Sequence, residues 1–372
     1  MSRPRRLRTT AIRSTSPSLR ESALARFFLA AYVLLVVYAS LYPLSGWREP
    51  ASSAFAFLVA PWPRYVTAFD LAANFFAYVP FGLLCVLALR PWLAPRAAGL
   101  LAVGSAAVLS LALEAAQSFL PARISSNLDV IANVAGAACG AVACAWLAPA
   151  LRGGPLQRLR AEALAPGAAA DLGLTLLGLW LFAQLNPATL LFGTGDLRDL
   201  FASAGGERHA AELFVSVEAV TTAANLAAVA LLASSVVRQG APVRSLLTAL
   251  IAVALAVKTF AFAVLMQAEN VFAWFTPGAQ LGLVAGAALA LAALRLQRTS
   301  RLALASALLM AATVLVNLSP PNPYLAATLK VWEQGHFLNF NGLTRLVSAA
   351  WPFAALVYLV YLAASRQRDR VR

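Results

Sequence analysis

Apolar residues run through this chain in long stretches, and short polar breaks between them carry most of the charges. A helix needs about 20 apolar residues to cross the hydrocarbon core of a membrane, and ten stretches reach or approach that length. The pattern therefore predicts an all-α, polytopic transmembrane helix bundle of about ten spans, near residues 27–44, 69–89, 97–119, 128–148, 171–191, 213–237, 246–268, 278–294, 302–318 and 346–364.

Composition agrees with this pattern. The chain is 61% hydrophobic and 12% charged, whereas a soluble domain is about a quarter charged. Its net charge of +14 does not indicate nucleic acid, because the basic residues punctuate the gaps between apolar stretches instead of gathering in one domain. The expected partner is the membrane lipid bilayer.

The basic residues also predict an orientation. With the N-terminus inside, 21 of the 29 Lys and Arg residues fall in inner segments and seven in outer loops, while Lys258 lies within a span. Cytoplasmic loops of membrane proteins carry such an excess. Both termini are therefore expected in the cytoplasm.

The polar breaks divide the chain into five parts. We expect a basic cytoplasmic arm at 1–26, a transmembrane domain at 27–150, a cytoplasmic linker at 151–170, a six-helix transmembrane region at 171–364 and a basic cytoplasmic tail at 365–372. Residues 218–222 resemble residues 70–74, and residues 267–270 resemble residues 114–117. Either the C-terminal region is a degenerate parallel repeat, or a shared Ala/Leu/Gly composition imitates one.

Polar residues interrupt the second, third and fourth predicted spans at helical spacing. The candidate ligand-binding residues are Asp70, Asn74, Tyr78, Glu114, Gln117, Arg123, Asp129 and Asn133. At 1.5 Å rise per residue, their three carboxyl groups lie within about 8 Å of the outer boundary. The sequence thus predicts that these carboxyl groups and one guanidinium meet at the external face.

Two interpretations of this set stay open. Arg123 can pair with a phosphate or carboxylate while the acids bind a cation or move protons. Alternatively, Arg123 neutralises Asp129, and the Asn and Gln side chains hydrogen-bond the helices together. We favour a functional site, because ionisable groups inside membranes usually serve one.

Lys258 falls near the middle of the seventh predicted span, and Glu218 lies nearer the outer end of the sixth. A lysine stem is long enough to reach toward such a neighbour. We expect a structural ion pair between Lys258 and Glu218.

The sequence offers little for catalysis. The three cysteines, Cys85, Cys139 and Cys144, lie inside predicted spans, and His209 and His336 are far apart. No metal site, no cofactor and no nucleophile–base pair is predicted, which argues against an enzyme.

The segment from Asp70 to Gly82, followed by Glu114-x-x-Gln117, Arg123, Ser125-Ser126 and Asp129-x-x-x-Asn133-x-x-Gly136, resembles the VanZ-like family of bacterial membrane proteins. The resemblance covers about residues 27–150. It implies a location in the bacterial inner (cytoplasmic) membrane, and a role in the cell envelope, because the family's namesake is associated with resistance to the glycopeptide teicoplanin. Asn74 stands where a histidine is frequent in the family.

The function expected from residues and resemblance together is binding or handling of a lipid or lipid-linked intermediate at the outer leaflet. The ligand would be a phospholipid or a polyprenyl-phosphate-linked molecule, with Arg123 on its phosphate. A proton-coupled transporter and a structural scaffold of an envelope complex are the alternatives.

Overall fold

The computed structural model describes residues 18–50, 52–62, 67–153, 155–198, 211–265, 271–320 and 338–371. These residues form helices and turns, and their β-structure is limited to one isolated bridge between Leu164 and Val237. Eight of the described helices are long and apolar enough to cross a membrane, and two apolar helices are shorter. The predicted helical fold is confirmed, and the chain is a multi-pass membrane protein.

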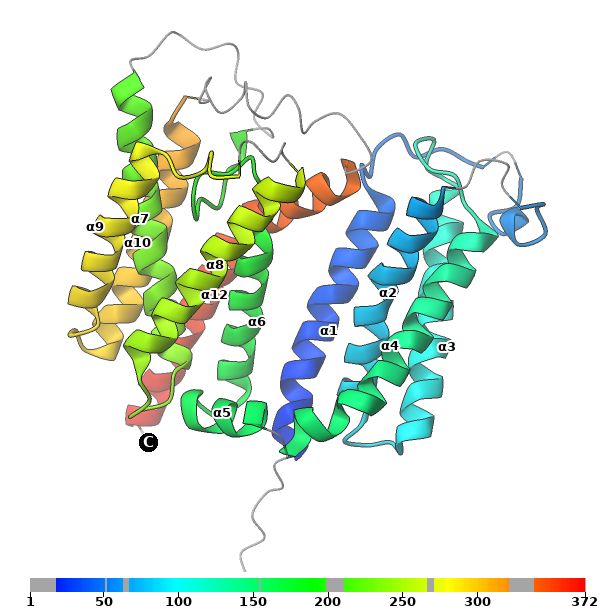
Figure 1. Cartoon of the computed structure of the whole chain (residues 1–372), viewed down its shortest axis with the longest axis horizontal. Helices are drawn as coiled ribbons and strands as arrows, with labels where there is room; N and C mark the ends of the chain where they lie inside the picture. Colours follow the sequence, from blue (N-terminus) through cyan, green and yellow to red (C-terminus); the bar gives the residue numbers. More distant parts are fainter. Residues whose placement is uncertain are drawn as a thin grey trace, which may run out of the picture.

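The N-terminal half contains four long helices that stand side by side (Figure 1). They are α1 (Ser18–Leu41), α2 (Ala68–Leu89), α3 (Pro95–Gln117) and α4 (Asn127–Gly153). The 3-10 helix η1 (Ala56–Leu58) lies in the connection between α1 and α2. Helix α1 begins within the predicted arm, and residues 1–17 lie outside the described part of the chain.

Helices α2 and α4 pack with their backbones in contact. A Cβ atom added to Gly136 would lie 2.1 Å from the carbonyl oxygen of Phe75, and one added to Gly140 would lie 2.0 Å from that of Val79. Main-chain atoms cannot move away as a flexible side chain can, so only glycine fits there. Small residues allow this close approach in membrane helices, and the contact fixes the faces that α2 and α4 turn toward each other.

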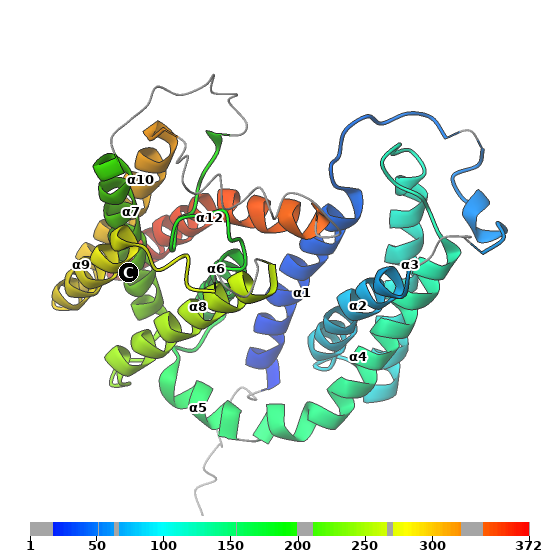
Figure 2. The ribbon, with the colours of Figure 1, turned by 45° about the horizontal axis from the view of Figure 1, so that its top comes forward.

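The C-terminal half is built around α7 (Ala211–Val236), which is buried along most of its length. Four helices pack against it: α6 (Ala168–Ala183), α8 (Val243–Leu265), α9 (Pro277–Ala293) and α10 (Arg298–Leu318); α12 (Leu338–Val371) packs against α6 and α10. Helix α12 runs diagonally across this half, as Figures 1 and 2 show. The predicted linker 151–170 includes a short helix, α5 (Pro155–Ala163).

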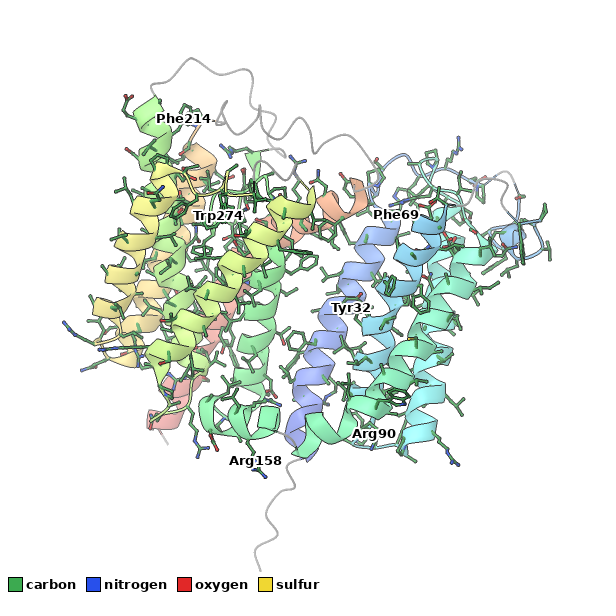
Figure 3. The ribbon with its side chains drawn as sticks, in the orientation of Figure 1. Tyr32, Phe69, Arg90, Arg158, Phe214 and Trp274 are labelled. Atoms are coloured by element: carbon green, nitrogen blue, oxygen red, sulfur yellow. The ribbon has the colours of Figure 1, made fainter. Side chains whose placement is uncertain are left out.

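We name the two ends of the bundle for reference. The outer end is where α1 and α3 finish and α2 and α4 begin; the inner end is the opposite one, where α2 finishes and α3 begins. Figure 3 shows Arg90 and Arg158 near the inner end and Phe69 at the outer end of α2.

The pair α7 and α9 repeats the contact between α2 and α4. A Cβ atom on Gly282 would lie 2.7 Å from the carbonyl oxygen of Ala219, and one on Gly286 would lie 2.9 Å from that of Ala223. This spacing matches the Gly136 and Gly140 contacts, as expected if the C-terminal region is a degenerate repeat, which is one of the two alternatives left open by the sequence. It aligns Glu218 with Asn74, whereas the sequence pattern aligned residue 218 with residue 70.

Candidate functional site

Two polar side chains from the sequence motif donate hydrogen bonds to main-chain carbonyl groups at the outer end of α1. Arg123 donates from Nε to the carbonyl oxygen of Tyr42 at 2.9 Å and from Nη2 to that of Ala39 at 3.0 Å. Gln117 donates to the carbonyl oxygen of Ser40 at 3.0 Å. The last carbonyl groups of a helix have no hydrogen-bond donor within it, so Arg123 and Gln117 supply donors for the carbonyl groups at the end of α1.

Glu114 joins the end of α3 to the start of α4. Its carboxylate, on a residue only 4% exposed, accepts a hydrogen bond from the backbone N–H of Ser126 at 2.8 Å. The hydroxyl of Ser125 donates to the carbonyl oxygen of Glu114 at 2.7 Å, and the hydroxyl of Ser126 accepts from the N–H of Leu128. The turn between the two helices is therefore fixed by side chains that the sequence pattern selected.

Asp70 is exposed and belongs to a capping box at the start of α2. Its carboxylate accepts from the hydroxyl of Thr67 at 2.7 Å, and its N–H donates back to that hydroxyl at 3.1 Å. Such a box satisfies orphan donors at a helix N-terminus. Asp70 therefore lies at the rim of the predicted site and is not buried in it.

A second group of polar residues lies deeper, between α2, α3 and α4. We call it the polar recess; it consists of Asn74, Tyr78, Ser110, Asp129 and Asn133. Asn74 and Asp129 interact near the outer end. One helical turn further along each helix, Asn133 donates to the hydroxyl of Ser110 at 2.9 Å, and the hydroxyl of Tyr78 lies beside the same serine.

Two atoms of the polar recess have no hydrogen-bond partner among the described residues. They are the hydroxyl oxygen of Tyr78 and the side-chain oxygen Oδ1 of Asn133. Tyr78 is 3% exposed and Asn133 is 5% exposed. The contact between Tyr78 and Ser110 falls short of hydrogen-bond geometry. Buried polar groups are nearly always paired, and other buried side chains among the described residues, such as Thr221 and Asn225, also keep an atom without a partner.

The four charged groups of the prediction lie at the same end of the bundle and interact in pairs. Arg123 interacts electrostatically with Glu114, Glu114 with Asp129, and Asp129 with Asp70. Burial lowers the pKa of Arg123, and the nearby carboxylate of Glu114 opposes that shift. The ordinary pKa of an arginine is so high that Arg123 remains charged despite this shift.

Within the described ranges, no group of three or more His, Cys, Asp or Glu side chains is arranged to hold a metal ion. The acidic residues of the outer end are instead drawn into helix-end contacts or into the polar recess.

The predicted Lys258–Glu218 ion pair is replaced by other contacts. The ammonium of Lys258, which is fully buried, donates to the carbonyl oxygens of Asn186 and Thr189 at 2.7 and 2.9 Å and to the hydroxyl of Thr189 at 3.2 Å. Glu218 accepts from the hydroxyl of Thr276 at 2.6 Å and interacts with Lys258 only at longer range. A lysine has three N–H donors, and the chain turn at 186–189 uses all three.

That turn belongs to a non-helical stretch, residues 184–198, whose first part, residues 184–191, was predicted to be helical. Helix α6 ends at Ala183 and is about 24 Å long at 1.5 Å per residue, shorter than the roughly 30 Å hydrocarbon core. The stretch is buried and held by side chains from neighbouring helices: Thr222 binds the Leu191 carbonyl, and Asn317 binds Gly195 and Leu197. The sequence features that indicate this interruption of the helix are Asn186-Pro187 and the nearby Gly193 and Gly195.

Comparison with known proteins covers the N-terminal half only. No curated protein and no solved structure is detectably similar to the chain. A family model does match, and its limits fall close to α1–α4, the helices that carry the motif. Residues 21–148, the N-terminal third of this multi-pass membrane protein, match the VanZ/LLP1 family model.

Proposed function

We propose that the protein binds the polar headgroup of a lipid or lipid-linked intermediate in the polar recess, from the outer leaflet of the bacterial inner membrane. The outer end then faces the outside, as the distribution of arginines predicts. The observation that carries this proposal is the pair of buried atoms without partners, the hydroxyl of Tyr78 and Oδ1 of Asn133.

These two atoms do not hold helices together by hydrogen bonds. A buried polar group left without a hydrogen bond costs about 1–3 kcal/mol, so stability alone would favour apolar side chains at both positions. The helix-end contacts of Glu114, Gln117 and Arg123 show the contrast, because each of those side chains has a protein partner. The two unpaired atoms of the polar recess support its assignment as the place where the headgroup binds.

The surroundings suit an amphiphilic ligand. Phe76 of α2 and Ile131 of α4 lie within a few residues of Asn74 and Asp129, and both are largely exposed. In a membrane such side chains face acyl chains. A lipid can therefore place its chains along the outer surface of α2 and α4 while its headgroup lies at the outer end of these helices, beside Asn74 and Asp129. A role in the envelope also agrees with the teicoplanin resistance associated with the VanZ-like family.

The structure changes the expected role of Arg123. Its guanidinium holds two carbonyl groups at the end of α1, so we assign it to positioning α1 and not to a phosphate contact. The direct contacts then fall to Asn74, Tyr78, Asp129 and Asn133.

Native mass spectrometry of the full chain, extracted with its lipids, tests this proposal. We expect bound lipid on the wild type and a loss of most of it in N133L, which removes both polar atoms of the amide at similar volume. S306A is the matched control, because that hydroxyl bonds only within α10. Equal lipid retention by N133L and S306A, with both folded, would refute the proposal.

Proton-coupled transport is the second candidate, and the 184–198 stretch favours it. Non-helical backbone at membrane depth is tolerated where it is buried in protein or lines a cavity, and transporters build binding sites from interrupted helices. A cavity of about 50 Å³ lies along this stretch, lined in part by Thr189, Asp196 and Arg198. Proteoliposomes that acidify in response to an imposed potential, in a Lys258-dependent way, would support this candidate.

A further inference from the structure

The connection between α1 and α2 carries large apolar side chains on its outside. We call residues 52–62, which include η1, the η1 loop. Its exposed apolar side chains and their exposed fractions are Phe55 54%, Leu58 47%, Val59 90% and Trp62 72%. The loop contains no charged residue. Contiguous apolar side chains on a protein surface indicate a contact with another protein or with a membrane.

The η1 loop is a hydrogen-bonded turn that presents these side chains in a fixed arrangement. The N–H groups of residues 56, 58, 59 and 60 each donate to the carbonyl oxygen three residues earlier, at 2.9 to 3.3 Å. The side-chain amide of Asn127 donates to the carbonyl oxygen of Ala60 at 2.9 Å, which ties the loop to the start of α4. Phe57 turns inward and is 7% exposed, so the other large apolar side chains remain on the outside.

The position of the η1 loop favours a membrane partner. Figures 1 and 2 show the loop beside the N-terminal half, on the side away from the C-terminal half, and Figure 1 shows it at the height where α2 and α4 begin. Helix α3 of the same half exposes Leu100 and Val108 at 76% and 68%, as expected of a helix that faces acyl chains. Lipid therefore fills the space beside this half, up to the level of the loop.

The hydrogen bonds of the η1 loop also suit a partly dehydrated environment. Backbone groups that leave water need partners within the protein, and the bonds within the turn and to Asn127 supply several of them. Leu58 and Val59 have no polar side-chain atom. The ring of Trp62 is apolar and has one N–H donor, which is typical of side chains at the level of lipid headgroups.

We propose that the η1 loop inserts into the lipid leaflet at the outer end of the bundle. Leu58 and Val59 then lie at the boundary between headgroups and acyl chains, where interfacial segments bury apolar side chains by about 5–10 Å. The ring of Trp62 lies among the headgroups. Because Asn127 joins the loop to α4, the inserted loop fixes the depth of the outer end of α4 in the membrane. This inference requires only that the chain spans a membrane, and it is independent of headgroup binding in the polar recess.

Fluorescence from a label on the η1 loop tests this inference, with the full chain in phospholipid nanodiscs. C139A provides the background, because it removes the exposed thiol and the other two cysteines are buried. V59C then carries an environment-sensitive fluorophore, and E49C carries the same label at an exposed, charged position of the same connection. We expect iodide in the water to quench the label about twofold or more weakly at V59C than at E49C, as insertion by several ångströms requires. Lipids brominated near the top of their acyl chains should quench only the label at V59C.

Two further labelled variants serve as references. V108C on α3 gives the reading of a position that faces acyl chains. L58C gives a second reading from the η1 loop, so that a local disturbance by one label does not decide the result. Thermal melting confirms that each labelled variant is folded.

The result that would overturn the proposal is iodide quenching at V59C and L58C as strong as at E49C, without quenching by brominated lipid. Nanodiscs that hold one copy or two copies of the chain distinguish the bilayer from a second copy as the partner. Protection from iodide in single-copy discs supports insertion into lipid. Protection that requires two copies would also overturn the proposal.

Discussion

Arg123 reaches back to Tyr42, donating from Nε to its main-chain oxygen at 2.9 Å across 81 positions of sequence. With Gln117 and Glu114, it joins the outer ends of α1, α3 and α4. These residues form much of the pattern that resembles the VanZ-like family. Their contacts explain why such residue types occur at this spacing: helix ends near a membrane need partners for their backbone groups.

Substitutions of Arg123 should show whether its positive charge alone stabilises the protein or whether the shape of the guanidinium is also required. R123Q loses two charge-assisted hydrogen bonds, so we expect the free energy of unfolding to fall by about 2–3 kcal/mol. R123K should lose at least half of that amount, because one ammonium cannot reproduce the two-pronged guanidinium contact. Thermal melting in detergent measures both, with the exposed R48Q as control. Wild-type stability of R123K would show that charge alone matters.

The contact between α2 and α4 gives a second prediction. G140A places a Cβ atom 2.0 Å from the carbonyl oxygen of Val79, and only a shift of the helices relieves that clash. We expect a loss of about 3 kcal/mol or more, or no folded protein. G104A on α3 meets nothing within 4 Å and should be neutral or slightly stabilising, since alanine favours helix. Similar yields of the two variants would contradict the close approach.

The contacts of Lys258 predict that a charge swap fails. K258E brings a carboxylate against the carbonyl oxygens of Asn186 and Thr189, which repel it, so K258E/E218K should be no better folded than K258E. A direct ion pair would instead be restored by the exchange. Expression and monodispersity in size-exclusion chromatography distinguish the two cases. Rescue of folding in the double variant would contradict the contacts described here and support the ion pair predicted from the sequence.

Tyr78 offers a test that separates binding from stability. Because its hydroxyl has no described partner, Y78F should leave the melting temperature unchanged or raise it, while reducing lipid retention. Y358F is the matched control, since that hydroxyl donates to the carbonyl oxygen of Ala169 at 3.0 Å. We expect Y358F to lose about 1 kcal/mol of stability and to retain lipid. The reverse pattern would make Tyr78 a structural residue.

Sequence reasoning succeeded where periodicity carried the information. The apolar stretches overlap the ten apolar helices among the described residues, and the spacing of polar residues placed Asp70, Glu114, Arg123 and Asp129 at the same end of the bundle. It could not separate helix-end contacts from a binding site, because both require polar groups at the same depth. Only the contacts show that Arg123 binds carbonyl groups while Tyr78 lacks a partner.

The C-terminal half shows a different limit. Residues 184–191 are apolar enough to continue a helix, and a length rule extends the span through them. The interruption depends on Lys258, Thr222 and Asn317, which lie on other helices and provide partners for an irregular backbone. Tertiary contacts of that kind leave no periodic signal, although Asn186-Pro187 marks the place.

The most direct test of the central claim is an experimental density map of the full chain in phospholipid nanodiscs, at a resolution that shows headgroups. We predict headgroup density within hydrogen-bond distance of the Tyr78 hydroxyl and Oδ1 of Asn133, continuous with acyl chains along α2 and α4. A recess that is collapsed or filled by water alone, with every headgroup outside it, would contradict the account.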